Sequence, residues 1–204
     1  MPNWCNNFIT LTPNENDKKS KKFNNFKKRF EIAATSNQPM CESLLSLKGA
    51  PKNYHEGGWY DYNVARFGTK WDFTIEKSCA SIFTREISFS TETAWTPPIA
   101  FLVELCESYG IDAKIEFEEG GCDFAGIISI SPEGIYDEVE FSSVDEYHYR
   151  TNDCFWENVT DYAHECDSWE EYSARYPFIV DKDDLDYLRE LYDNAVKERE
   201  NEGV

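Results

Sequence analysis

The chain has 204 residues, and its 20 lysines and arginines against 39 aspartates and glutamates give a formal net charge of −19 at pH 7. A chain of this length buries enough apolar surface to fold without disulfides. A field of this sign opposes binding to nucleic-acid phosphates and to anionic membranes, and it favours basic protein surfaces or cations as partners.

The seven cysteines are scattered along the chain and form no Cys-x-x-Cys pair. Several stand in apolar surroundings, which predicts reduced thiols in the core of a cytosolic protein. The first residues lack the basic start and the apolar run of a signal peptide, and no stretch holds the roughly eighteen apolar residues that span a bilayer. We therefore expect a cytoplasmic protein.

The first predicted strand covers residues 4–12, where polar and apolar residues alternate up to Pro13-Asn14. A helix follows, with Phe23, Phe26 and Phe30 on one face and a lysine cluster from Lys18 to Arg29 on the others. Glycines, prolines and asparagines interrupt residues 35–58, which predicts a long insertion that packs as a flap.

Residues 57–72 combine five aromatic side chains with glycines and polar residues, and they fit neither a helical nor a strand period. A segment with this much side-chain volume is expected to be anchored to a core or shaped for a ligand.

Two strands are predicted at residues 72–77 and 86–91. A helix then opens with a Thr96 cap and Pro97-Pro98, runs from Ile99 to Tyr109, and stops at Gly110. Further strands are predicted at residues 114–118, 124–130 and 135–141. This order predicts an α+β fold of the ferredoxin-like split βαβ type, with two helices on one face of an antiparallel sheet that final strands extend.

The pattern changes after residue 143. Residues 145–204 hold six lysines and arginines against eighteen aspartates and glutamates, and the aromatic spacing predicts short helices followed by one helix from Ile179 to Glu200. We therefore predict a ferredoxin-like domain at 1–143, with its insertion at about 35–58, and an acidic aromatic helical extension at 144–204.

Three blocks of sequence resemble a known family. They are Met1 to Asn7, the Trp59 to Asp72 segment that ends in Gly68-Thr69-Lys70-Trp71-Asp72, and Phe89-Ser90-Thr91 to Ala94-Trp95-Thr96-Pro97-Pro98 with Gly121 to Gly126. In this order they resemble the YubB-like ferredoxin-like family carried by bacteriophages and plasmids. The resemblance covers about residues 1–135 and implies a fold and a mobile-element context, but no activity, cofactor or catalytic set.

The aromatic residues offer one candidate binding surface. Bases or a peptide could stack on Trp59, Tyr60, Trp71 and Trp95, with Asn63 and Lys70 as polar contacts. The structural alternative is that the tryptophans lock the long connection onto the sheet.

The acidic extension offers a second candidate surface. Its carboxylates could imitate the phosphate spacing of a duplex and occupy a basic groove of a partner protein; the candidates are Asp153, Glu157, Asp161, Glu165, Glu170 and Glu171. The alternative is a solvated helix surface without a partner.

Enzymatic chemistry has little support in the sequence. No nucleophile elbow, P-loop, dinucleotide fingerprint or zinc-protease motif is present. Asp61, Asp72, Glu92 and Asp123 could hold Mg²⁺ if they converged, but each also has a turn or capping role open to it. We expect no catalytic residue, metal or cofactor.

The sequence thus predicts a non-enzymatic phage or plasmid accessory protein that binds and inhibits a basic host protein of a nucleic-acid-handling or defence system, without direct nucleic-acid or membrane binding. Two alternatives remain open. One is a nucleic-acid-binding module that uses the sheet aromatics and the Lys18–Arg29 helix, and the other is a metal-dependent enzyme acting on nucleotides.

Overall fold

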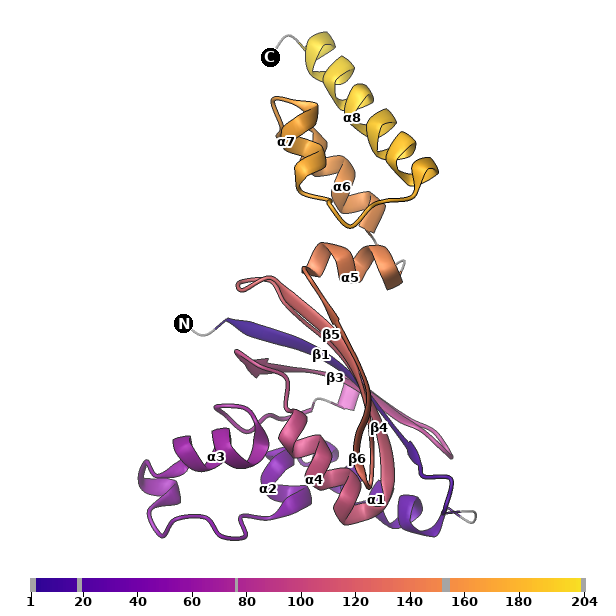
Figure 1. Cartoon of the computed structure of the whole chain (residues 1–204). Helices are drawn as coiled ribbons and strands as arrows, with labels where there is room; N and C mark the ends of the chain where they lie inside the picture. The colour runs from indigo at the N-terminus through magenta and orange to yellow at the C-terminus, as the bar shows by residue number, and fades with distance from the viewer. Residues whose placement is uncertain (1–2, 18–19, 76, 152–154, 203–204) are drawn as a thin grey trace. The chain divides into compact units, whose positions relative to one another are not determined.

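The computed structural model describes residues 3–17, 20–75, 77–151 and 155–202. The chain separates into two compact units, Met1–Phe141 and Ser142–Val204, which we call unit 1 and unit 2. Figure 1 shows the sheet in unit 1 and the helices of unit 2.

Unit 1 is built on a six-stranded antiparallel sheet with the order β2-β3-β1-β4-β5-β6. Its strands are β1 (Trp4–Pro13), β2 (Ala80–Ile82), β3 (Ile87–Ala94), β4 (Ile111–Glu119), β5 (Phe124–Ser131) and β6 (Gly134–Phe141). With the helices α1 (Lys21–Thr35) and α4 (Ile99–Tyr109) in between, the first four strands have the predicted ferredoxin-like topology. The fold class is confirmed, and β5 and β6 extend the sheet as expected.

The two faces of the sheet differ in character. Every second residue of β1 is buried, and Cys5, Ile9 and Leu11 are fully so. These residues lie on the face that α1 and α4 cover (Figure 1). Phe23, Phe26 and Phe30 of α1 complete this core, as the sequence predicted. The opposite face, which we call the open face, carries Trp4, Asn6 and Phe8 of β1, Ser90 and Glu92 of β3, and Glu116 and Glu118 of β4.

The described residues between α1 and β2 contain two helices that the sequence analysis did not predict. They are α2 (Met40–Leu45) and α3 (Trp59–Phe67), separated by the 3-10 turn η1 (Tyr54–Glu56). Residues 57–72 were therefore wrongly interpreted as having no helical period. The inward-facing residues of α3 are Asn63 and Phe67, four positions apart, and the first of them is polar, which hides the apolar repeat.

The strand predicted at residues 72–77 is also wrong. Residues 72–75 form no strand, η2 (Lys77–Cys79) is a 3-10 turn, and the paired strand is the three-residue β2 within the predicted connection. Phe73 and Ile75 are buried, so their alternation with polar residues serves core packing without a partner strand.

Helix α4 covers the residues that the sequence predicted, Ile99–Tyr109, but it lacks the predicted cap. Its end at Gly110 has a φ of 61°, the left-handed conformation that favours glycine. The predicted Thr96 cap is not formed. The Thr96 hydroxyl instead donates to the carbonyl oxygen of Gly68 over 2.7 Å, which ties the start of α4 to the end of α3.

In the described residues of unit 2, four helices share a core of their own: α5 (Val144–Thr151), α6 (Phe155–Ala163), α7 (Trp169–Ala174) and α8 (Lys182–Glu202). Val159, Tyr172 and Leu188 are fully or almost fully buried there. α8 starts at Lys182 instead of Ile179, because Asp181 accepts the backbone N–H of Asp183 over 2.9 Å and caps the helix. Among the helices of the described residues, none has the length and apolar character needed to cross a bilayer.

Candidate functional site

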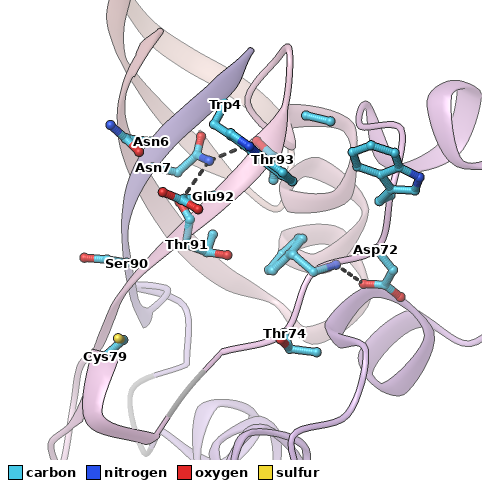
Figure 2. Close-up of a pocket in the computed structure, with 13 residues that line it drawn as sticks. Trp4, Asn6, Asn7, Asp72, Thr74, Cys79, Ser90, Thr91, Glu92 and Thr93 are labelled. Carbon is cyan, nitrogen blue, oxygen red and sulfur yellow. Dashed lines mark hydrogen bonds between the residues drawn. The ribbon is translucent and has the colours of Figure 1, made fainter. Parts of the chain in front are cut away.

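A hollow of about 630 Å³ lies beside the second half of β3 (Figure 2). It is lined by residues 90–94 of β3, by the start of β1, by residues 71–74, and by Cys79. Trp4 and Trp71 both line it, with their ring centroids 5.8 Å apart. We call it the tryptophan hollow. Its volume falls in the range of roughly 300–1,000 Å³ that is usual for ligand pockets.

Residues 71–74 form the wall across from β3, as Figure 2 shows for Asp72 and Thr74. The Asp72 carboxylate accepts the backbone N–H groups of Cys41 (2.8 Å) and Glu42 (2.9 Å) and thereby caps α2. It also accepts the N–H of Phe73 over 2.8 Å. The first two bonds fix the wall to α2, and the third lies within the wall.

Asn63 fixes the other end of this wall. The side chain is only 3% exposed. Its Nδ2 donates to the carbonyl oxygen of Lys70 over 3.2 Å, and its Oδ1 accepts the Tyr54 hydroxyl over 3.0 Å. Trp71 therefore lies between two anchored neighbours, Lys70 and Asp72, and its position follows from theirs.

A cation–aromatic cluster lies next to the hollow and consists of Tyr60, Lys70, Trp71 and Trp95. The Lys70 Nζ lies 4.6 Å from the Trp71 ring centroid, 4.7 Å from that of Trp95 and 5.7 Å from that of Tyr60. Trp95 holds a φ of 70° with its side chain 43% exposed. A bulky residue is uncommon in this left-handed region.

Buried polar groups beside the hollow are satisfied within the chain. Asn7 is 3% exposed, and its Nδ2 lies 2.9 Å from the Cys5 carbonyl oxygen, 3.2 Å from that of Thr91 and 3.0 Å from the Thr93 hydroxyl. The Thr93 hydroxyl in turn donates to the Thr96 carbonyl oxygen over 2.7 Å. The Asn7 amide and the Thr93 hydroxyl therefore hold the hollow together through hydrogen bonds within the chain.

The charge at the hollow is negative. Asp72 and Glu92 are the charged residues that line it, and no lysine, arginine or histidine does so in the described part of the chain. The Asp72 carboxylate already accepts three backbone N–H groups, whereas the exposed Glu92 side chain has no ion-pair partner among the described residues. Indole faces and a carboxylate together suit a cationic ligand.

The predicted aromatic residues fall into different places. Trp71 lines the tryptophan hollow, while Tyr60, Lys70 and Trp95 join it in the cluster. Trp59 lines a second hollow of about 330 Å³, which shares the wall of Trp71 and Asp72. Asn63 also lines this second hollow, and each end of its amide makes a hydrogen bond inside the fold.

Sequence reasoning missed Trp4 and Asn6 as residues of the hollow, and it considered Glu92 only as a metal ligand. The alternation of β1 was the available signal, because it puts Trp4 and Asn6 on one face of a strand. The strand order that brings Glu92 beside them was not visible in the sequence.

The predicted acidic residues lie on unit 2. Asp161, Glu165 and Glu170 are exposed and have no ion-pair partner among the residues that the structure describes. Glu171 has a local role: its N–H bonds the Ser168 hydroxyl and its carboxylate accepts the N–H of Asp167, which caps α7. Glu157 lies in α6, and Asp153 lies outside the described residues.

Three arginines of unit 2 form ion pairs with carboxylates of the same unit, at N···O distances of 2.9–3.5 Å: Arg150 with Glu146, Arg175 with Asp145, and Arg189 with Asp193. Six lysines and arginines stand against eighteen acids in this unit. Its surface is therefore strongly anionic over a core of tyrosines and aliphatic residues.

The lysines of α1 and the aromatic residues of the open face lie on opposite sides of the sheet. Phe23, Phe26 and Phe30 turn α1 toward the covered face, whereas Trp4 and Phe8 lie on the other. The two features therefore do not form one groove.

The carboxylates considered for Mg²⁺ do not gather. Asp61 lies in the first turn of α3, and Asp123 lies in the turn between β4 and β5. Within residues 3–17, 20–75, 77–151 and 155–202, no three histidine, cysteine, aspartate or glutamate side chains are grouped so as to hold a metal ion.

Comparison with known proteins identifies a fold. Residues 70–153 match a family model described as a ferredoxin-like domain in Api92-like protein, in agreement with the topology of the sheet. No curated protein sequence matches the chain significantly.

The chain is also similar to a solved structure, that of a protein api92 from Yersinia pseudotuberculosis. The sequence identity is 8%, the TM-score is 0.41, and the alignment covers 70% of this chain and 99% of the other. A likeness at this score does not bear on function.

Proposed function

We propose that this protein is a non-enzymatic binding protein whose partner is a protein with a basic surface. The observation that carries the proposal is the charge of unit 2, where eighteen acids stand against six lysines and arginines on a folded helical scaffold. Because the described helices share a core, they hold their positions relative to one another, and the anionic surface that they carry can complement a cationic one.

The physical advantage of such a surface lies in association. Opposite charges steer two proteins together over about one Debye length, roughly 10 Å at 0.1 M salt, and can raise the rate of association by about 10- to 1,000-fold. The complex would therefore weaken as salt is added.

The expected biological setting follows from the resemblance to a YubB-like family of phages and plasmids. In that setting the protein acts in the cytoplasm of a host cell and inhibits a nucleic-acid-handling protein, such as one of a defence system, by imitating DNA at its basic groove. Proteins that bind DNA or RNA carry such grooves because they neutralise phosphates.

Direct nucleic-acid binding is less well supported. A ferredoxin-like sheet that stacks bases uses aromatic residues of its open face; here Phe8 of that face pairs across the strands with Ser90 and Glu116, and Glu92 and Glu118 lie one pair further along. Carboxylates around the ring repel phosphates.

Two matched variants test the proposal. The first changes Asp161→Asn, Glu165→Gln and Glu170→Gln on unit 2, and the second changes Glu31→Gln, Glu56→Gln and Glu107→Gln on unit 1. All six side chains are exposed, and both variants carry a net charge of −16 in place of −19. The full-length wild-type chain is used to capture proteins from a host lysate, and the captured protein is then purified.

Binding of the purified partner is measured at about 50 mM and about 150 mM salt. We expect the unit 2 variant to bind about tenfold more weakly and the unit 1 variant to stay within about twofold of wild type. Equal losses in both variants, or tight binding of the wild-type chain to duplex DNA or RNA itself, would contradict the proposal.

A further inference from the structure

One side of β3 lacks a neighbouring strand beyond its first residues. β1 pairs with the whole length of β3, from Leu11 opposite Ile87 to Trp4 opposite Ala94. On the other side β2 pairs only with residues 87–89. In the described part of the chain, no strand accompanies β3 on that side toward Ala94.

The register shows which backbone groups point to that side. Phe83 donates its N–H to the Glu86 carbonyl over 2.8 Å, so the even-numbered residues of β3 direct their N–H and C=O groups toward β2. Trp95 donates its N–H to the Asn3 carbonyl over 2.9 Å, so the odd-numbered residues face β1. Glu92 and Ala94 therefore direct their backbone groups away from β1, past the end of β2.

The space beyond these groups is the tryptophan hollow, which β3 and residues 71–74 line from two sides (Figure 2). A strand pairing with β3 would lie about 4.8 Å from it, in line with β2. Its side chains would alternate between the buried side of the sheet and the open face, where Trp4 and Glu92 lie. The hollow thus offers an added strand the backbone groups of Glu92 and Ala94 for pairing, and the side chains of Trp4 and Glu92 for contact.

The charges identify the kind of strand that fits. Asp72 and Glu92 line the hollow, and no described cationic side chain does, so a segment with lysine or arginine is complementary. A second copy of this chain would instead bring another Glu92 to the same edge, and like charges on paired strands repel.

We propose that an extended, lysine- or arginine-containing segment of a partner protein adds to the sheet as a strand, pairing with the backbone of Glu92 and Ala94 inside the tryptophan hollow. Main-chain bonds supply the affinity in this mode of recognition, and the flanking side chains supply the preference for sequence. The site lies on unit 1 and does not depend on the acids of unit 2.

A peptide probe tests the pairing. A fluorescein-labelled peptide of about eight residues, alternating lysine and valine, is compared with the same peptide N-methylated at every residue. Both carry the same charge, but the second cannot donate backbone hydrogen bonds. We expect the methylated peptide to bind the full chain at least about tenfold more weakly. Equal binding of the two, or no saturable binding of the first below about 1 mM, would overturn the proposal.

Substitutions at Glu92 separate backbone from charge. Glu92→Gln removes the charge, whereas Glu92→Pro also removes an N–H that no strand of the described residues uses. Such an edge position tolerates proline. We expect peptide affinity to fall further for Glu92→Pro than for Glu92→Gln, with Glu107→Gln unchanged as the control for lost charge. The far-ultraviolet circular dichroism of each variant shows that it is folded. Equal effects of the two Glu92 variants would exclude strand pairing.

Two cysteines report the location. Cys79 lines the hollow and is exposed, whereas Cys122 is exposed in the turn between β4 and β5. Bound peptide should slow alkylation of Cys79 by at least about fivefold and leave Cys122 unchanged. If instead the unit 2 variant alone loses the peptide and Cys79 stays reactive, the proposed function survives and the strand-pairing site does not.

Discussion

Burial governs the chemistry of individual cysteines in this protein. Desolvation raises the pKa of the Cys5 and Cys106 thiols to about 12. Burial, and then the nearby Asp72 carboxylate, raises the pKa of Cys41 well above its ordinary value. The thiolate is the form that reacts, so these buried thiols are inert in the folded chain.

Alkylation kinetics should therefore divide the cysteines into two classes. With iodoacetamide at about pH 8, we expect Cys79 and Cys122, which are exposed, to react about a hundredfold faster than Cys5, Cys41 and Cys106. Mass spectrometry of tryptic peptides measures each site, and denaturant should abolish the difference. Fast labelling of Cys5 in the folded protein would show that the start of β1 is open.

Glu119 links stability to pH. Its burial opposes ionisation, but the backbone N–H groups of Gly121 (2.7 Å) and Cys122 (2.8 Å) stabilise the carboxylate, and the pKa of Glu119 lies below its ordinary value of 4.5 as the net result. A group with a lowered pKa in the folded state contributes stability above its unfolded pKa and loses it as pH falls through its folded pKa.

Glu119→Gln should thus be less stable than wild type at pH 7, and the difference should shrink as the pH falls below about 4.5. Urea denaturation at several pH values measures the free energy of unfolding. Glu107→Gln, at an exposed position of α4, is the control for the loss of one carboxylate. A difference that grows toward acid pH would contradict the assigned sign.

Asn63 and Asp72 show where residue-level prediction from sequence ends. Both are polar residues beside tryptophans, which makes them candidates for a ligand or metal site. The Asn63 amide is hydrogen-bonded to the Tyr54 hydroxyl and to the Lys70 carbonyl oxygen. The Asp72 carboxylate accepts a backbone N–H at the start of α2. The sequence left a capping role open for Asp72, and the structure shows one. The helices that these partners belong to were not visible in the sequence, so which helix Asp72 caps and which groups Asn63 bonds could not be assigned in advance.

At the scale of elements, Gly68 ends α3 and packs against the first turn of α4. Its φ is 76°, and a Cβ there would lie 3.3 Å from the backbone nitrogen of Ala100. Gly49 has nearly the same φ, 78°, but a Cβ there would meet nothing within 4 Å. Comparing alanine substitutions at Gly49 and Gly68 therefore separates two free-energy costs. One is that of a left-handed backbone conformation, and the other is that of the steric contact with Ala100.

We expect Gly49→Ala to lower the free energy of unfolding by about 1 kcal/mol, the cost of an alanine in the left-handed region. Gly68→Ala should lower it by about 1–3 kcal/mol more, because α4 would have to shift. Chemical denaturation of the two variants and wild type provides the measurement. If both variants lose the same free energy of unfolding, α4 can shift to admit the Cβ at no energetic cost.

Elements were predictable where a repeat was long and lay against one core. The three phenylalanines of α1 and the alternation in β1 identified both elements. Residues 72–75 alternate in the same way, since Phe73 and Ile75 are buried, but no strand pairs with them. β2 has three residues, too few to show a period. Its length decides how much of the β3 edge is unpaired, and therefore the hollow was not predictable from sequence.

At the scale of the whole molecule, the two units have separate cores and different charge. Unit 1 has fourteen lysines and arginines against twenty-one acids, a net charge of −7, and unit 2 has six against eighteen, a net charge of −12. Repulsion among like charges destabilises a compact state, and salt screens it. Unit 2, the smaller unit with the greater charge, should be the more sensitive to salt.

Calorimetry should accordingly resolve two unfolding transitions. Leu102→Ala in unit 1 and Leu188→Ala in unit 2 each remove a fully buried side chain at a cost of about 2–5 kcal/mol, so each should lower the transition of its own unit. Raising salt from about 20 to about 200 mM should raise the transition that Leu188→Ala lowers by more than the other. One shared transition, lowered by both substitutions, would contradict the independence of the units.

The central position of β1 also determines when the sheet can assemble. Leu11 pairs with Ile87 and Asn6 with Glu118, partners that are 76 and 112 positions later in the chain. A ribosome adds about 5–20 residues per second, so β1 emerges roughly 5–25 seconds before both of its neighbours exist. During that interval the backbone N–H and C=O groups of β1 have no strand to pair with, and its apolar side chains are not yet buried. Chaperones that bind nascent chains therefore have a defined segment to protect.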